Sequence, residues 1–267
     1  MLVAIDVGNT QTVVGLYEGE RLAHHFRLTT EHHRSQDEYG VLLSAMLQDV
    51  GVQASGINSA ILSSVVPPLN RIFIGMCKDR FGVEPLVVGP GIKTGMPILY
   101  ESPREVGADR IVNGVAGYER FRSEPGGPFG VIIVDFGTAT TFDVVSPAGE
   151  YLGGAIAPGV GISTEALFLH ASKLPRVDLV MPDTVLGKNT VHSMQAGILY
   201  GYRALVDGVV AQLRREVDFE PRVMATGGVA VVIADRSESI EMVDEFLTLR
   251  GLRIIHTRNH RDSGGAR

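Results

Sequence analysis

Two stretches of the sequence share a pattern that suits phosphate chemistry. In VAIDVGNTQTVVGLY, residues 3–17, an apolar run ends at Asp6 and is followed by a Gly-Asn-Thr turn and a second apolar run. In VIIVDFGTATTFDVV, residues 131–145, the same plan recurs around Asp135. Consecutive backbone amides in such a turn, with nearby hydroxyl and amide side chains, can bind phosphate oxygens without a lysine. Two such turns predict a polyphosphate ligand gripped by both.

The two turns also match in their surroundings, which indicates an internal duplication. Aligning Asp6 with Asp135 pairs Gly8 with Gly137, Asn9 with Thr138, and Thr12 with Thr141, and the later turns at Gly19 and Gly149 match within one residue. A chance match of turn motifs is the alternative, and the wider agreement favours duplication. We therefore expect two α/β domains of one plan with a cleft between them, and glycines that take positive φ at both bends.

Asp6 and Asp135 are the basis for predicting a metal ion. A carboxylate at Asp6 or Asp135 would repel a bare phosphate, so its presence there predicts a cation between the two charges, and magnesium is the expected ion. The alternative is that each aspartate caps its own hairpin turn, a common role for this residue type. For one turn we would favour the cap, but for two matched copies we favour the cation.

A third chemical candidate lies in EVGADRIVN. Asp109 and Arg110 are expected where a loop enters a helix, and an arginine does not suit the positive end of a helix dipole. In the functional interpretation, Asp109 is a base, and Arg110 beside it binds the anionic group of an acidic substrate. The alternative is a helix cap with a surface arginine.

Other motifs carry less weight. GPGIKTG, residues 89–95, has Ile92 where a phosphate-binding loop requires glycine, so we expect a structural loop. TGGVA, residues 226–230, follows an expected strand and either lets a base or ribose approach bare backbone or is an ordinary turn. Cys77 lies in an apolar helical stretch and is expected in the core.

Histidine content does not predict a metal site. The two pairs His24, His25 and His32, His33 are adjacent in sequence, and neighbours in a strand point to opposite faces. No acidic partner stands at a suitable spacing, so metal ligation is disfavoured.

Composition excludes several classes. The chain has 267 residues, 45% of them hydrophobic, and its 24 basic residues are scattered under a net charge of -6, which disfavours nucleic-acid binding. A single cysteine predicts a reducing compartment, hence the cytoplasm. Neither a signal peptide nor a stretch of about 18 uncharged apolar residues is present, so no membrane association is expected.

The expected elements position these candidates. We predict strands within residues 2–28, a helix after Ser35 that stops at Gly51, and then a β-α-β series to residue 89. A helix over residues 108–121 precedes RSEPGGPFG, whose breakers we take as the domain boundary. The domains are then residues 1–121 and 122–258, with a frayed tail at 259–267.

The second half is expected to repeat the first. It begins with a strand-turn-strand series over residues 129–158 and continues with helices near 160–172 and 190–216. A strand at PRVMAT, residues 221–226, completes the α/β pattern.

Taken together, the motifs resemble type III pantothenate kinases over nearly the whole chain. The resemblance rests on DVGNT, GPGIKTG followed by YESPREVGADR, DFGTATTFDVV, GGAIAPG, GKNTVHSMQAG and ATGG in this order. It implies two ribonuclease-H-like domains of the acetate and sugar kinase, heat-shock chaperone and actin superfamily, with ATP between them. It further implies phosphorylation of pantothenate to 4'-phosphopantothenate, the first step of coenzyme A biosynthesis. A homodimer with pantothenate at its interface, magnesium, and a monovalent cation (K⁺ or NH₄⁺) are also implied.

The resemblance also implies roles for single residues. The ATP-binding positions are Asp6, Val7, Gly8, Asn9, Thr10, Gln11, Thr12, Val13 and Thr138. The pantothenate-binding positions are Tyr100, Gly107, Ala108, Asp109, Arg110 and Thr190. Asp109 is the implied catalytic proton acceptor, Asp135 the ligand of the monovalent cation, and Asp6 a magnesium ligand, directly or through water. Gln11 stands where many relatives carry asparagine.

Two rival functions stay open at the level of sequence. The same fold could phosphorylate another hydroxyl, of a sugar or a second hydroxy acid. A nucleotide-binding regulator without catalysis is the other rival, because a fold can keep its ligand site and lose its chemistry. Retention of GADR and of both turn aspartates argues for catalysis.

Overall fold

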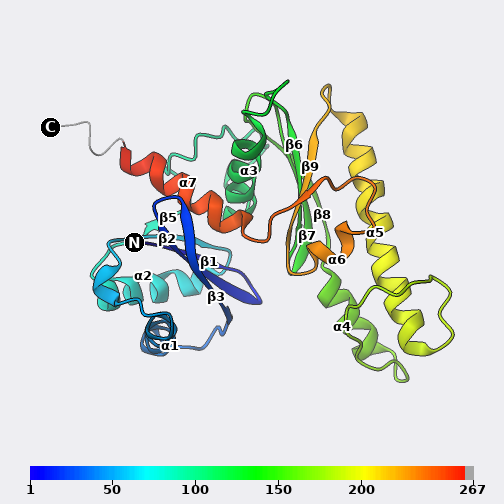
Figure 1. Cartoon of the computed structure of the whole chain (residues 1–267), viewed down its shortest axis with the longest axis horizontal. Coiled ribbons are helices and arrows are strands. Elements are labelled where there is room, and N and C mark those ends of the chain that lie inside the picture. The colour runs from blue at the N-terminus through cyan, green and yellow to red at the C-terminus, as the bar shows by residue number, and fades with distance from the viewer. Residues whose placement is uncertain (262–267) are drawn as a thin grey trace. The chain divides into compact units, whose positions relative to one another are not determined.

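The computed structural model describes residues 1–261 of the chain. By their contacts these residues form two compact units, each with its own five-stranded sheet (Figure 1). The first unit contains Met1–Met96, Ser102–Ala116 and residues 248–261. The second contains Pro97–Glu101 and Gly117–Leu247.

The first sheet has the strand order β3-β2-β1-β4-β5. Its strands are β1 (Leu2–Val7), β2 (Gln11–Glu18), β3 (Arg21–Thr29), β4 (Ser59–Ser64) and β5 (Leu86–Val87). The first three strands form the predicted antiparallel meander, whereas β4 runs parallel to β1 and β5 runs parallel to β4. The connections to the parallel strands contain α1 (Gln36–Asp49), the 3₁₀ turn η1 (Ala54–Gly56) and α2 (Pro67–Phe81).

One face of the first sheet packs against α1 and α2. Side chains alternate along a strand, so Val3, Ile5 and Val7 of β1 share this face. They join the buried residues of the two helices: Tyr39, Leu43 and Leu47 from α1, and Leu69, Phe73, Met76 and Cys77 from α2. Burial raises the pKa of the Cys77 thiol to about 12, which confirms the predicted core role of this residue.

Helix α1 begins where the sequence predicts. The Ser35 hydroxyl accepts a hydrogen bond from the backbone N–H of Glu38 at 3.3 Å, and the Glu38 carboxylate accepts one from the Ser35 N–H at 2.7 Å. This capping box satisfies two amides that the helix leaves without an internal acceptor. The helix ends at Asp49, and Gly51 leaves it with a φ of 72°.

Helix α7 (Leu247–Arg261) packs on the other face of the first sheet, and the first half of α3 (Ala108–Phe121) belongs to the same unit. Gly15 of β2 lies opposite Ala4, and a β-carbon on Gly15 would come within 2.8 Å of Leu249 in α7. The two helices also touch closely, since a β-carbon on Gly251 would lie 2.2 Å from the Val112 carbonyl oxygen. This contact requires glycine at position 251.

The second sheet repeats the topology of the first, in the order β10-β9-β6-β7-β8. Its strands are β6 (Val131–Phe136), β7 (Ala139–Val145), β8 (Tyr151–Pro158), β9 (Arg222–Gly227) and β10 (Met242–Val243). As in the first sheet, three antiparallel strands are followed by two parallel ones. The predicted duplication of an α/β plan is therefore confirmed.

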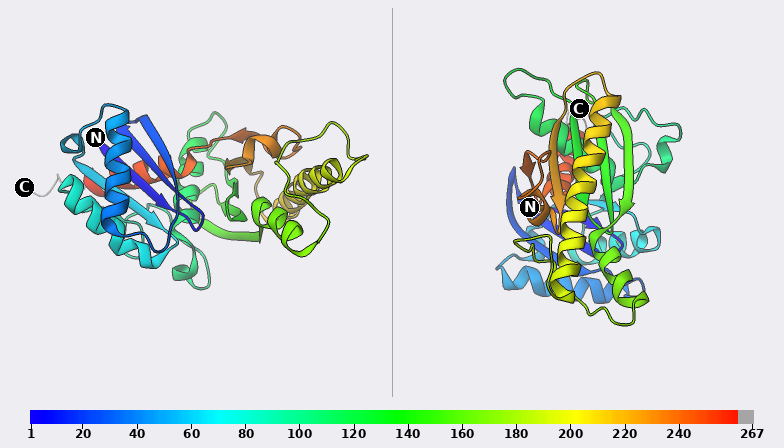
Figure 2. Two further views of the ribbon diagram at one scale, coloured as in Figure 1. Left: turned by 90° about the horizontal axis from the view of Figure 1, so that it is seen from below. Right: turned by 90° about the vertical axis from the view of Figure 1, so that its right-hand side faces the viewer.

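Three helices form the core of the second unit with one face of its sheet. They are α4 (Val160–His170), α5 (Thr190–Glu216) and α6 (Ala230–Ala234), and the long helix α5 runs along the sheet (Figures 1 and 2). Ile132, Val134 and Phe136 of β6 face them. Among the described residues no helix, α5 included, is long and apolar enough to cross a lipid bilayer.

The division into units differs from the boundaries expected from sequence. The expected boundary followed residue 121, whereas the division falls within α3, and residues 248–258 group with the first unit instead of the second. The physical reason is the close contact of α7 with α3 and β2, which a reading along the chain does not reveal. Of the expected frayed tail, residues 259–261 end α7, and the rest lies outside the described residues.

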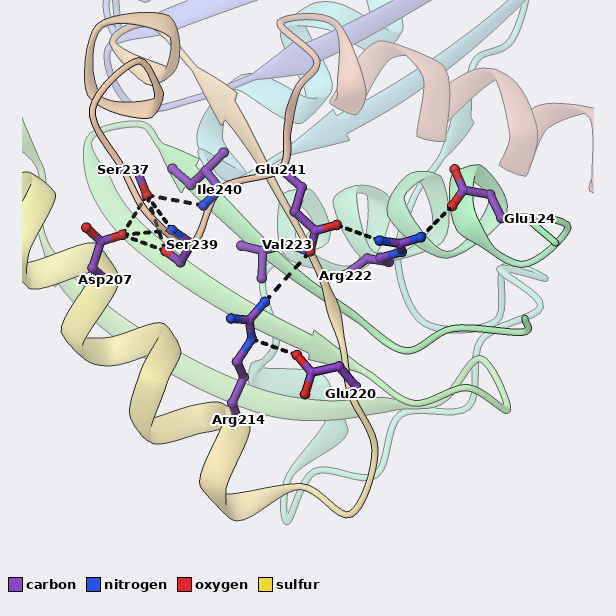
Figure 3. A network of polar contacts seen from close by, with 10 residues as sticks. All are labelled: Glu124, Asp207, Arg214, Glu220, Arg222, Val223, Ser237, Ser239, Ile240 and Glu241. Atoms are coloured by element: carbon purple, nitrogen blue, oxygen red, sulfur yellow. Dashed lines mark hydrogen bonds and ion pairs between the residues drawn. The ribbon is translucent and has the colours of Figure 1, made fainter. Parts of the chain in front are cut away.

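A polar network fastens the segment after α6 to α5 (Figure 3). One Asp207 carboxylate oxygen accepts hydrogen bonds from the Ser237 hydroxyl at 2.6 Å and from the Ser239 hydroxyl at 2.7 Å. The backbone N–H groups of Glu238 and Ser239 donate to the same oxygen at 3.2 Å. Burial alone would raise the pKa of Asp207, but these four donors outweigh it, so the net shift is downward.

Asp207→Asn removes the charge that strengthens this network. We expect a loss of about 1–3 kcal/mol in the free energy of unfolding at pH 7, typical of hydrogen bonds to a charged group. Because the folded-state pKa is lowered, the difference should be full above the unfolded value of about 3.9 and disappear as pH falls through the folded value. Urea denaturation from pH 7 to pH 3 measures it.

Asp235→Asn is the matched control for this prediction. The Asp235 side chain is 75% exposed and forms an ion pair with the neighbouring Arg236 at 3.5 Å. Its replacement should leave stability nearly unchanged at every pH, because exposed ion pairs contribute little. Equal losses in both variants would contradict the role given to Asp207.

Candidate functional site

The first turn, residues 8–11, closes the hairpin between β1 and β2. The last strand pair is Val7 with Thr12, and the Gly8 N–H donates to the Gln11 carbonyl oxygen at 3.0 Å. Asn9, Thr10 and Gln11 are exposed at the tip. The predicted ligand-binding groups therefore lie on an open loop of four residues.

The second turn, residues 137–139, is one residue shorter. The last strand pair is Phe136 with Thr140, and the Gly137 N–H donates to the Ala139 carbonyl oxygen at 3.1 Å. Thr138 is exposed at its tip. Three loop residues replace the four of the first turn.

This register corrects the sequence alignment of the two turns. Thr12 pairs with the residue after Asp6, and Thr140 pairs with the residue after Asp135, so these two threonines are equivalent. The expected equivalence of Thr12 and Thr141 is wrong, because the shorter loop shifts the return strand by one residue. Thr12 and Thr140 are both fully buried.

The glycines of the turns act differently from the prediction. Neither Gly8 nor Gly137 has a positive φ, whereas Gly19 and Gly149 do, at 60° and 83°. Gly8 is needed for space, because a β-carbon there would lie 2.9 Å from the Gln11 carbonyl oxygen. At Gly137 the nearest such contact is an ordinary 3.5 Å.

Asp6 and Asp135 occupy equivalent places in the two sheets. Asp6 is paired with Ser63 on the parallel neighbour β4, and Asp135 with Thr226 on the parallel neighbour β9. Both aspartates are half-buried and lie on the sheet face opposite the main core of their unit. An Asp135 carboxylate oxygen lies 3.8 Å from the β-carbon position of Gly137, so it is directed at the turn.

The donor set around these carboxylates suits a cation shared with a ligand. Within residues 1–261, no three His, Cys, Asp or Glu side chains gather into a group that could hold a metal. Magnesium in phosphoryl-transfer sites is typically bound through one or two carboxylates plus substrate phosphates. Asp6 and Asp135, each a single aspartate just before a turn, fit that pattern.

The second turn is backed by the start of α4. A β-carbon on Gly159 would lie 2.2 Å from the Thr138 carbonyl oxygen and 2.6 Å from that of Gly137. Gly159 is also the N-cap of α4. Only a residue without a side chain allows this approach, a role that sequence analysis did not assign, although the motif GGAIAPG contains the residue.

The side chain of Thr12 does not lie on the ligand side of the first turn. Its hydroxyl is 2.9 Å from that of Thr30, and the residue has no exposed surface. Val7 is likewise buried, and Val13 is half-buried. These three predicted phosphate-binding residues therefore present no exposed side chain at the turn.

Asp109 and Arg110 lie where the sequence predicts, in the first turn of α3. One Asp109 carboxylate oxygen accepts a hydrogen bond from the Arg110 N–H at 2.8 Å. A β-carbon on Gly107 would lie 2.5 Å from that oxygen, so glycine makes room for the carboxylate. Loss of hydration on burial raises the pKa of Asp109, although the Arg110 N–H and its charge oppose the shift.

Arg110 is buried, with 8% of its surface exposed. The predicted alternative of a helix cap with a surface arginine is therefore wrong about the arginine. A buried guanidinium needs acidic or carbonyl partners, since an unpaired buried charge is costly. The residue suits an anionic ligand group better than it suits solvent.

Tyr100 and Thr190 belong to the second unit, whereas residues 107–110 belong to the first. Backbone bonds of 2.8 Å tie Pro97 and Leu99 to Tyr151, and the Tyr100 ring lies 6.4 Å from the Tyr151 ring. Thr190 is the exposed first residue of α5. Of the predicted substrate residues, only 107–110 are placed together.

A group of three polar residues near Tyr100 was not anticipated. The Tyr151 hydroxyl donates to the buried Asp143 carboxylate at 2.8 Å, and the Thr141 hydroxyl donates to its other oxygen at 3.1 Å. A lone aspartate in an apolar strand is the only sequence signal for this group. It anchors the ring against which Tyr100 packs.

The weaker motifs are also resolved. Residues 89–95 form the predicted loop, which Asn259 of α7 holds through the Lys93 carbonyl oxygen at 3.1 Å. TGGVA ends β9 at Gly227 and leads into the short helix α6. A β-carbon on Gly228 would meet no atom within 4 Å, so the backbone there is open.

Comparison with known proteins identifies a family. The model of the family described as type III pantothenate kinase matches residues 2–212. A type III pantothenate kinase of Myxococcus xanthus is 56% identical over 260 residues, covering 97% of this chain and 99% of that protein. One of Geobacter sulfurreducens is 57% identical over 259 residues, covering 97% and 99%.

Solved structures agree in fold. A protein from Campylobacter jejuni described as a putative Baf family transcriptional activator has a TM-score of 0.60 at 18% identity, covering 97% of this chain and 99% of that one. A ROK hexokinase from Thermus thermophilus has a TM-score of 0.53 at 13% identity, covering 98% and 99%. At these identities the likeness concerns the fold alone.

Proposed function

The chain belongs to the type III pantothenate kinase family, kinases that phosphorylate pantothenate in the first step of coenzyme A biosynthesis, and from this premise we propose which residues do the work. The proposed catalytic residue is Asp109. The observation that carries this assignment is a half-buried carboxylate at the start of α3, with a raised pKa and a buried arginine beside it.

We propose that the two turns bind the phosphates of ATP. The first turn supplies the segment Asp6 to Val13, with its exposed tip at Asn9, Thr10 and Gln11, and the second supplies Thr138. Support comes from the matched hairpins and from the open backbone at both tips. The longer amide of Gln11 serves in place of the asparagine of many relatives.

Asp6 is proposed to hold magnesium, directly or through water, and Asp135 a monovalent cation, K⁺ or NH₄⁺. When bound, these ions neutralise negative charge on the phosphates. The two carboxylates hold their positions at the strand ends through the paired strands on both sides. The chain itself contributes orientation and fixed dipoles, which matter most in a loose phosphoryl transition state.

The proposed reaction needs a hydroxyl held in line with the γ-phosphorus. The 4'-hydroxyl oxygen of pantothenate forms a bond to that phosphorus, the bond to the β–γ bridging oxygen breaks, and ADP leaves. The Asp109 carboxylate accepts the hydroxyl proton. Since a raised pKa makes the carboxylate a better base than an ordinary aspartate, its burial assists this step.

The other proposed pantothenate contacts orient the substrate. Arg110 pairs with the substrate carboxylate, for which a guanidinium offers two parallel N–H donors. Gly107 and Ala108 leave backbone room at the start of α3, and Tyr100 offers a partly exposed ring, with 38% of its surface accessible. Thr190 is proposed to act from the partner subunit of a homodimer.

The homodimer proposal is supported by an exposed apolar surface on the second unit, which we call the α4–α5 surface. It comprises Ile156, Ile162, Leu167, Phe168, Leu169, Val180, Val185, Leu186 and Val191. Large apolar side chains that stay this exposed within one stretch of chain, residues 156–191, are a feature of surfaces that bind another protein. Thr190 lies within the same stretch of chain, next to Val191. A second copy of this chain is the proposed occupant.

We also propose that the enzyme works in the cytoplasm. The support is the single cysteine, which is buried, and the substrates themselves, which a biosynthetic pathway supplies inside the cell.

Asp109→Asn tests the proposed function. Removing the proton acceptor should lower kcat by about 10²- to 10⁴-fold, the usual range for acid–base help, with small changes in both Michaelis constants. In the wild type, kcat should fall with acid at a pH above the ordinary aspartate pKa of about 3.9, because the Asp109 pKa is raised. This limb should be absent in the variant. A variant with normal turnover would remove Asp109 from the mechanism.

Arg110→Gln is the matched comparison, one residue along the same helix. It should raise KM for pantothenate about 10- to 100-fold, the value of a lost charge-assisted pair, and change kcat less. The alcohol analogue of pantothenate, with CH₂OH in place of the carboxylate, should be used equally well by variant and wild type. An unchanged KM for pantothenate would overturn the assignment.

Asp135→Asn tests the monovalent cation. With ATP, magnesium and pantothenate present, potassium should raise the rate of ADP formation in the wild type, because a cation there offsets phosphate charge. The variant lacks the charge that holds the ion, so it should gain little. A coupled assay titrated with potassium, against sodium as the control salt, makes the comparison. Equal activation of both proteins by potassium would show that Asp135 does not hold the ion.

Leu186→Asp tests the dimer. Its side chain is 77% exposed on the α4–α5 surface, so a charge there should not disturb folding but should block association. Sedimentation equilibrium should show the wild type as a dimer and the variant as a monomer with a raised KM for pantothenate. Val41→Asp, at a 59% exposed site on α1, is the control and should stay dimeric. A monomeric wild type would refute the proposal.

A further inference from the structure

Thr30, the residue after β3, makes three contacts with the first turn. Its backbone N–H donates to the Thr10 carbonyl oxygen at 2.9 Å. Its hydroxyl donates to the Gly8 carbonyl oxygen at 2.8 Å and lies 2.9 Å from the hydroxyl of Thr12. Thr30 is buried, with 6% of its surface exposed. A residue 20 positions from the turn in sequence thus holds it from behind.

The direction of these hydrogen bonds follows from proton counting. A hydroxyl has one hydrogen to donate and two lone pairs to accept with. The Thr30 hydroxyl donates its hydrogen to the Gly8 carbonyl oxygen, which carries no hydrogen and can only accept. The hydrogen between the two threonines therefore comes from Thr12, and the chain runs from Thr12 to Thr30 to Gly8.

The contacts of Thr30 turn the carbonyl oxygens of the turn inward. The carbonyls of Gly8 and Thr10 accept bonds from Thr30, and the carbonyl of Gln11 accepts one from the Gly8 N–H. A carbonyl oxygen carries partial negative charge and would repel a phosphate. Because these three oxygens are already hydrogen-bonded within the protein, their partial negative charge is offset and their orientation is fixed, which favours an anion at the turn.

The second turn has no hydroxyl side chain in the position equivalent to Thr30. Thr29 pairs with Gln11 and precedes Thr30, just as Pro158 pairs with Ala139 and precedes Gly159. The residue equivalent to Thr30 is therefore Gly159, which has no side chain and holds its turn by close backbone contact. A hydroxyl clamp on the first turn alone can be removed without touching the second.

We propose that Thr30 is a positioning residue that orients the first turn for the phosphates of ATP. The inference rests on the proposed function of that turn and adds a residue that does not itself touch the ligand. Thr30→Val keeps the shape of the side chain and the backbone bond to Thr10. It removes the hydroxyl, which leaves the Gly8 carbonyl and the Thr12 hydroxyl without this partner.

Steady-state kinetics and thermal unfolding of four variants test the proposal. Thr30→Val should raise KM for ATP about tenfold, the equivalent of one or two net hydrogen bonds, and leave KM for pantothenate within about twofold. Thr30→Ser retains the hydroxyl and should stay close to the wild type. Thr29→Val, on the exposed neighbouring residue, is the control and should have no effect. Thr12→Val should raise KM for ATP less than Thr30→Val.

The double variant Thr12→Val/Thr30→Val shows whether the hydroxyls of Thr12 and Thr30 act as one hydrogen-bond chain or as two independent contacts. Residues that share one hydrogen-bond chain are not additive, so its KM for ATP should match that of Thr30→Val alone. An increase in KM for ATP equal to the product of the two single-variant increases would contradict a single hydrogen-bond chain. Equal impairment of Thr30→Ser and Thr30→Val, or unchanged KM for ATP in Thr30→Val, would overturn the proposal.

Amide hydrogen exchange without nucleotide separates this inference from the proposed function. If Thr30 positions the turn, Thr30→Val should speed exchange of the amides of residues 8–11, and Thr30→Ser should not. Faster exchange with an unchanged KM for ATP would show that the clamp exists and that the turn does not bind ATP. Unchanged exchange would overturn the clamp itself. If Thr30→Val folds poorly, Thr12→Val supplies the readout for a broken hydrogen-bond chain, with Thr30→Ser as the control that retains the hydroxyl.

Discussion

A hairpin that binds phosphate through its backbone must keep its own carbonyl oxygens away from the ligand. Amide and carbonyl groups alternate along the chain, so a turn cannot present one without accommodating the other. In the first turn the Gln11 carbonyl accepts a hydrogen bond from Gly8 within the hairpin, and the carbonyls of Gly8 and Thr10 accept hydrogen bonds from Thr30, the residue after β3. In the second turn Gly159 packs against the carbonyls of Gly137 and Thr138. The proposed binding of phosphate by the two turns depends on these contacts.

Each sheet has one face that packs on the core and another face that carries the aspartate before the turn. In each unit one face of the central strand is wholly apolar and packs on its helices, while the aspartate before the turn lies on the other face. Period-two alternation makes this separation unavoidable once the core residues are set. The first unit covers its second face with α7, whose Leu249 packs over Gly15. The carboxylate thus stays near the turn without entering the core.

The Asp109 site shows how a helix start can hold a base. The helix offers the Arg110 N–H, which stabilises a carboxylate, while burial destabilises it, and burial wins. Gly107 is the enabling residue because any side chain there would displace the carboxylate oxygen. The proposed role of Asp109 as a base draws on this local geometry, because phosphoryl transfer depends on orientation as much as on basicity.

The sequence by itself determined the helices and strands from β1 to β9, the duplicated α/β plan, the two turns and the start of α3, because these follow from local periodicity, caps and breakers, whereas it did not indicate β10 or assign α7. It could not reveal that the second loop is one residue shorter, which makes Thr140 and not Thr141 the partner of Thr12 in the two halves. Only the tertiary structure decided that Thr30 and Gly159 hold the turns and that α7 joins the first unit. These facts depend on contacts between segments far apart in the chain, and hydrogen-bond register and close backbone approach leave no periodic signal in sequence.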